Sequence, residues 1–76
     1  KNAAFERPEV GGVWKRRWSP LEDGIVDFDR LFNALYAIGY DDWLVIEDFS
    51  QVRSSREALT YNLRFIREKL GQVDIA

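Results

Sequence analysis

The chain contains no cysteine, no histidine and no methionine among its 76 residues. Without cysteine there are no disulfide bridges and no thiolate nucleophiles, and the lack of both cysteine and histidine excludes Cys/His zinc sites and His-based triads within these residues. No apolar run approaches the roughly 20 residues that cross a bilayer, and the start at Lys1 has no signal-peptide pattern. We therefore expect a cytoplasmic protein with no membrane partner.

The composition is that of a small folded domain. Hydrophobic residues make up 46% of the chain and charged residues 32%, with a net charge of -2, so a core is expected and a general attraction to nucleic acid is not. A chain of this length forms one domain at most. Because it opens without a methionine, on residues typical of the middle of a sequence, we expect a fragment of a longer protein.

Two helices are predicted from apolar spacing and end signals. Asp27 offers an N-cap oxygen, and apolar residues at spacings of three and four continue to Gly39, which predicts a helix over residues 27–39. A capping box that starts at Ser54 predicts a second helix over residues 54–71.

The segment between the helices is predicted to be a strand. Residues 43–48 form an apolar run that ends in two carboxylates, which is typical of a parallel strand buried on both faces. Residues 1–26 lack periodicity and carry turn residues, so we expect a long loop there, with a short strand candidate at residues 1–4 only. A single strand needs partners from residues 1–4, from another copy of the chain or from residues elsewhere, so a homo-oligomer joined at unpaired strand edges is one expectation.

The two acids at the end of this strand are predicted to point apart. Side chains alternate along a strand, so Glu47 and Asp48 cannot form a catalytic pair. Two interpretations stay open: either one acid faces a site, or neither does, because both are solvated at the strand end or Asp48 caps a nearby group. One face of the predicted strand carries Trp43, Val45 and Glu47, and the other face carries Leu44, Ile46 and Asp48.

A short basic segment, residues 14–18, alternates aromatic and cationic side chains. Such a pattern can stack bases and hold phosphates. In a chain that is acidic overall it is more typical of a solvated loop, so a nucleic-acid partner is not expected.

Four segments give the chain a recognisable order, namely residues 1–5, 18–28, 35–43 and 46–49. In order and spacing they resemble the C-terminal part of the sugar phosphate isomerase/epimerase family, the xylose isomerase-like group of β/α barrels. The resemblance covers nearly the whole chain. It implies an α/β fold, a C-terminal fragment of a (β/α)8 TIM barrel. Residues 1–76 would form one partial domain: the end of strand seven, the loop to residue 26, helix seven, strand eight over 43–48 and helix eight.

The resemblance also implies a function. Members of the family move a proton between adjacent carbons of a ketose or aldose, and Glu47 matches a glutamate that serves as metal ligand and acid/base group. The implied cofactor is a divalent metal such as manganese or magnesium, and the implied partner is a sugar or sugar phosphate. Arg7 and Arg16 are candidate substrate contacts, against the alternative of solvated loop arginines. With Glu47 as its one ligand, the fragment by itself is expected to be inactive and metal-free.

Two alternatives accompany this interpretation. Related barrels cleave abasic DNA with a similar metal site, so an endonuclease IV-like nuclease is the first alternative. A non-catalytic fragment that associates with its own copies is the second.

Glu22 departs from the family pattern, since many members carry a glycine at this position of the loop before helix seven.

Overall fold

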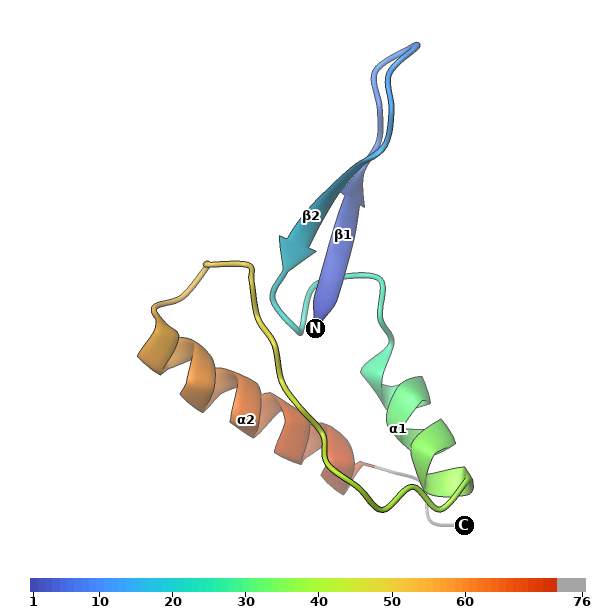
Figure 1. Cartoon of the computed structure of the whole chain (residues 1–76), viewed down its shortest axis with the longest axis vertical. Helices are drawn as coiled ribbons and strands as arrows, with labels where there is room; N and C mark the ends of the chain where they lie inside the picture. Colours follow the sequence, from blue (N-terminus) through green and yellow to red (C-terminus); the bar gives the residue numbers. More distant parts are fainter. Residues whose placement is uncertain (73–76) are drawn as a thin grey trace.

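The computed structural model describes residues 1–72. A two-stranded antiparallel hairpin projects from a pair of helices, and the link between the helices runs across their surface (Figure 1). In chain order the elements are β1 (Asn2–Glu6), β2 (Lys15–Ser19), α1 (Phe28–Ala37) and α2 (Ser55–Gly71).

The hairpin corrects the prediction of a long loop over residues 1–26. The strand candidate at residues 1–4 extends to Glu6 and pairs with β2, with Ala4 opposite Arg17. A turn closes the connection where Gly12 N donates to Glu9 O at 2.7 Å. The apolar pattern does not predict β2, because Lys15 to Arg17 are exposed on both faces of the strand and no alternation of apolar and polar residues marks it.

Both helices begin at the residues that their capping signals predict. Asp27 Oδ1 accepts a hydrogen bond from Arg30 N at 3.1 Å, and Ser54 Oγ accepts from Glu57 N at 3.3 Å. Each bond satisfies an amide that the first helical turn leaves free. After α1, Gly39 adopts the left-handed conformation at φ 71°, which allows the chain to turn away from the helix.

The core is small and lies where the two helices meet the loop after β2. Leu21, Phe28, Phe32 and Ile66 are buried together, and Phe65 packs against them. The rings of Phe28 and Phe65 meet edge to face, with centroids 5.7 Å apart. This cluster joins α1 to α2 and leaves many large apolar side chains outside it.

Hydrogen bonds of the Asn2 side chain connect the hairpin to this core. Its buried side chain donates from Nδ2 to Leu21 O at 3.0 Å and accepts at Oδ1 from Val26 N at 3.0 Å. The bond from Ile25 N to Ala3 O, at 2.9 Å, reinforces the same junction. The base of β1 and the loop that leads into α1 are therefore held in a fixed relation.

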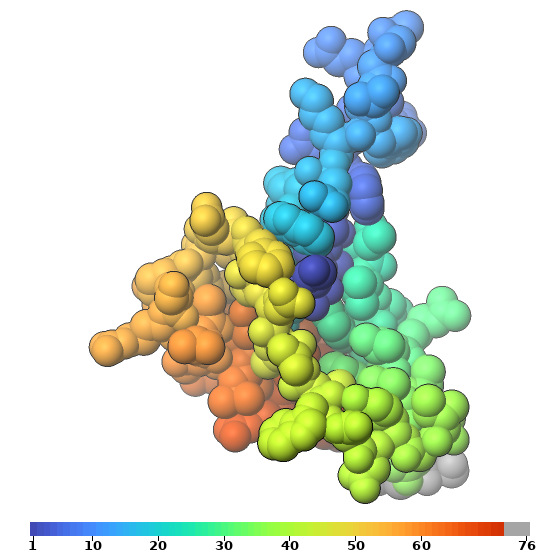
Figure 2. Space-filling model, viewed as in Figure 1, coloured from blue at the N-terminus to red at the C-terminus, as the bar shows by residue number. Residues whose placement is uncertain are grey.

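Residues 43–48 contain no strand, which corrects the prediction of a buried strand there. Within residues 1–72 no backbone hydrogen bond joins them to β1 or β2, and they cross the surface beside α2 (Figure 2). Trp43 and Val45 are 86% and 81% exposed, against 42% and 37% for Leu44 and Ile46. The predicted alternation of faces is thus present, but in the described part of the chain no strand covers the face that carries Trp43 and Val45.

Candidate functional site

Glu47 lies on the open side of the segment, next to the start of β1. Its side chain is half exposed, and Lys1 Nζ lies 3.9 Å from its Oε1. An ion pair this long and this exposed adds little stability. The position therefore leaves the Glu47 carboxylate accessible to a ligand.

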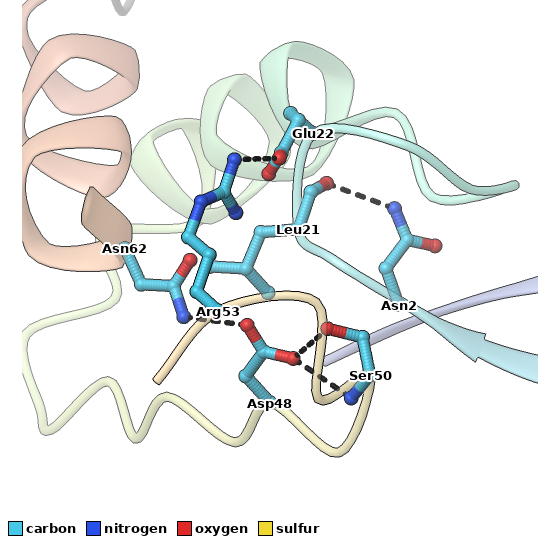
Figure 3. A network of polar contacts seen from close by, with 7 residues as sticks. All are labelled: Asn2, Leu21, Glu22, Asp48, Ser50, Arg53 and Asn62. Atoms are coloured by element: carbon cyan, nitrogen blue, oxygen red, sulfur yellow. Dashed lines mark hydrogen bonds and ion pairs between the residues drawn. The ribbon is translucent and has the colours of Figure 1, made fainter. Parts of the chain in front are cut away.

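Asp48 points the other way, into a network of polar contacts with α2 (Figure 3). Its Oδ1 accepts from Ser50 N at 2.9 Å and from Ser50 Oγ at 2.6 Å, and its Oδ2 accepts from Asn62 Nδ2 at 2.9 Å. Burial by itself would raise the pKa of Asp48, but these hydrogen bonds and the nearby Arg53 outweigh burial and lower it. Asp48 therefore connects the segment to α2, in agreement with the capping alternative, while Glu47 contacts only Lys1 among the ion pairs of residues 1–72.

Replacing Asp48 with asparagine is expected to remove an acid-dependent part of the stability. Because the folded state lowers the pKa of Asp48, its contribution is complete above the unfolded-state value near 3.8 and is lost as pH falls through the lower folded-state value. Urea unfolding between pH 2 and pH 7 measures the free energy of unfolding of the wild type and of the variant. We expect the difference between wild type and Asp48→Asn to be largest at neutral pH and to shrink toward pH 2. A difference that stays constant with pH would contradict this role.

Glu22, which departs from the family pattern, forms an ion pair with Arg53 (Figure 3). Arg53 Nη2 donates to Glu22 Oε1 at 2.6 Å, and its guanidinium lies 3.6 Å from the ring centre of Tyr61. The hydrogen bond to Glu22 raises the pKa of Arg53. This contact connects the loop after β2 to the start of α2. The sequence pattern did not predict it, because the two residues are 31 positions apart.

The structure separates the two candidate substrate-binding arginines. Arg16, on β2, stacks its guanidinium 4.2 Å from the ring centre of Trp18, and Trp18 in turn lies 5.8 Å from Phe49, two positions beyond Glu47. Arg7 lies in the projecting connection between the strands, away from this group (Figure 1). Sequence reasoning missed Lys1, whose Nζ is 5.0 Å from the Trp18 ring centre as well as close to Glu47.

Metal binding at Glu47 would require further ligands. Among residues 1–72, no three acidic side chains lie close enough together to hold an ion. A single carboxylate does not complete the coordination of a hard divalent cation, which takes six or more oxygen ligands. What the described residues can provide is one ligand, with a cation and an aromatic pair beside it.

Comparison with family models, with curated proteins and with solved structures finds no match for this chain. The resemblance described above therefore depends on the order of its own residues. In the part of the chain that the structure describes, neither helix has the length and apolar character needed to cross a membrane.

Proposed function

We propose that this chain is the C-terminal part of a cytoplasmic, metal-dependent sugar or sugar phosphate isomerase or epimerase with a (β/α)8 barrel fold. The observation that carries the proposal is the division of faces at residues 43–48. Leu44 and Ile46 are the more covered side chains, and Asp48 is hydrogen-bonded to α2, whereas Glu47 is half exposed and lies 3.9 Å from Lys1. A barrel strand divides in the same way, with one face under the helices and the other facing the interior.

The elements of the chain by itself follow in the order strand, strand, helix, helix, so the proposed fold requires residues 43–48, between the two helices, to become a strand when they pair with other strands. Trp43 and Val45 are large apolar side chains on the open face, and the interior of a barrel is filled by such residues. Under the proposal, Trp43 and Val45 are exposed in this chain because their face would contact other strands of a barrel.

Glu47 lies at the carboxyl end of the segment, where barrel enzymes place their chemistry. A manganese or magnesium ion, bound there with ligands from other strands, would polarise the oxygens of the sugar. The Glu47 carboxylate would bind that ion and carry the proton between adjacent carbons, a role that typically contributes roughly 10²- to 10⁴-fold to rate. Lys1, 3.9 Å from Glu47, places a positive charge beside the carboxylate.

The test compares the two neighbouring acids in a longer chain that contains these residues. Glu47→Gln is expected to reduce exchange of the sugar C–H proton with D2O, followed by NMR, by roughly 10²- to 10⁴-fold. It should also weaken Mn²⁺ binding, followed by electron paramagnetic resonance. Asp48→Asn, the matched control, removes the same charge one position away and should retain exchange and Mn²⁺ binding at pH 7.

Two results would refute the proposal. One is wild-type exchange in Glu47→Gln. The other is salt-dependent DNA binding by the wild type without any exchange, which would favour the nuclease alternative instead.

A further inference from the structure

A cavity lies between the last turn of α1, the last turn of α2 and residues 40–44 (Figure 1). Its volume is about 410 Å3, within the roughly 300–1,000 Å3 of pockets that hold small molecules. The apolar part of its wall comes from both helices and the segment between them, namely Phe32, Leu35, Leu44 and Leu70. The cavity is at the start of the segment over residues 43–48, whereas Glu47 is at its end.

Two tyrosine rings also line the cavity. Tyr36, in the last turn of α1, is 52% exposed, and Tyr40, which follows the helix, is 45% exposed, so neither ring is enclosed by the core. The Tyr40 hydroxyl donates to Trp43 O at 2.7 Å, which holds this ring against the turn before the segment. The face of an aromatic ring is electrostatically negative and attracts a cation. Both rings therefore favour a positively charged ligand.

The charged groups of the cavity are of one sign. Among the described residues that line it, Asp41 and Asp42 are the charged ones. Within residues 1–72 the ion pairs are those of Lys1, Arg53 and Lys69, so neither acid has a cationic partner. Both helices also end at the cavity, and the carbonyl groups at a helix C-terminus carry partial negative charge. The last turn of α1 has no basic residue to offset that charge.

We propose that this cavity binds a small organic ammonium ion, a positively charged nitrogen on a compact apolar body. The apolar wall and the tyrosine rings receive the body, and the carboxylates of Asp41 and Asp42 neutralise the charge. A bare divalent metal ion suits the cavity less well, because it takes six or more oxygen ligands and most of this wall is apolar. The site does not depend on the proposed isomerase chemistry, because Glu47 does not line the cavity.

The experiment titrates the 76-residue chain with three probes of similar shape and different charge, following the ring protons of Tyr36 and Tyr40 by NMR. Choline is cationic, 3,3-dimethyl-1-butanol is its neutral analogue, and 3,3-dimethylbutyrate is the anionic one. At constant ionic strength we expect choline to bind about tenfold more tightly than either analogue. Equal affinities for choline and the neutral analogue, or no change in the tyrosine signals, would overturn the proposal.

The double variant Asp41→Asn/Asp42→Asn tests the role of the two charges. An asparagine side chain still offers an oxygen to Trp43 N, which Asp42 Oδ1 accepts from at 2.7 Å, so the turn should be preserved. We expect choline binding to weaken about tenfold and binding of the neutral analogue to stay within about twofold. The matched control, Glu9→Gln/Asp23→Asn, removes two charges from exposed acids outside the cavity and should change choline binding less than about twofold. Equal losses in the two double variants would overturn the proposal.

A second pair of variants tests the contribution of an aromatic ring. Tyr36→Leu keeps an apolar side chain but removes the ring, so choline binding should weaken about fivefold. Tyr36→Phe keeps the ring and should bind choline within about twofold of wild type. Retained dispersion of the amide spectrum confirms that each variant is folded. Wild-type choline affinity in Tyr36→Leu would overturn the contact between cation and ring on which the proposal depends.

Discussion

Replacing Gly24 with alanine is expected to lower the free energy of unfolding by about 2–4 kcal/mol, the combined cost of overpacking and of a disrupted buried hydrogen bond. A Cβ atom at Gly24 would overlap the side chain of Asn2 and lie 2.5 Å from Ser19 Oγ. Asn2 cannot move aside without breaking its bonds to Leu21 and Val26, since both use its amide group. Urea unfolding followed by circular dichroism measures the effect.

Two other glycines provide controls for Gly24. Gly71, at the end of α2, has no atom near its Cβ position, so Gly71→Ala is expected to leave stability within about 0.5 kcal/mol of wild type. Gly39 has equally open space but a φ of 71°, so Gly39→Ala should cost about 1 kcal/mol from backbone strain alone. If Gly24→Ala costs no more than Gly39→Ala, the close approach of Asn2 does not constrain this loop.

Phe32→Ala is expected to cost about 3–5 kcal/mol, the usual range for removing a buried aromatic ring. Phe32 is 4% exposed, and its ring centroid lies 5.9 Å from that of Phe28 in the cluster that joins the helices. A domain of this size has a total stability of only about 4–11 kcal/mol, so the substitution should bring the chain close to unfolding.

Leu31→Ala is the control for Phe32→Ala. Leu31 is adjacent on α1 but 41% exposed, so its truncation should cost less than about 1.5 kcal/mol. Thermal unfolding followed at 222 nm compares the two variants. A loss for Leu31→Ala as large as that for Phe32→Ala would place the core on a different face of α1.

Local signals predicted much of the helical part of this fold. The N-caps at Asp27 and Ser54 and the turn at Gly39 act on residues within one helical turn, so the sequence displays both partners of each interaction. Alternation along residues 43–48 likewise placed Glu47 and Asp48 on opposite faces. Each of these features depends on the local geometry of the backbone, although the partners of Glu47 and Asp48 themselves, Lys1 and Asn62, lie far away in the chain.

The hairpin and the contacts between distant residues could not be predicted in the same way. β2 is mostly cationic and solvated, so its extended conformation comes from pairing with β1 and not from its own pattern. The bond of Asn2 to Leu21 and the pair of Glu22 with Arg53 join residues 19 and 31 positions apart. Such partners become apparent only when the chain is folded.

The position of Asn2 has a consequence for how the chain unfolds. One amide side chain joins the first residue of β1 to Val26, two positions before α1 begins. Opening the base of the hairpin therefore also breaks the contacts that lead into α1 and that hold Leu21 in the core. We expect the hairpin base and α1 to open together, as one cooperative unit, while the outer part of the hairpin frays independently.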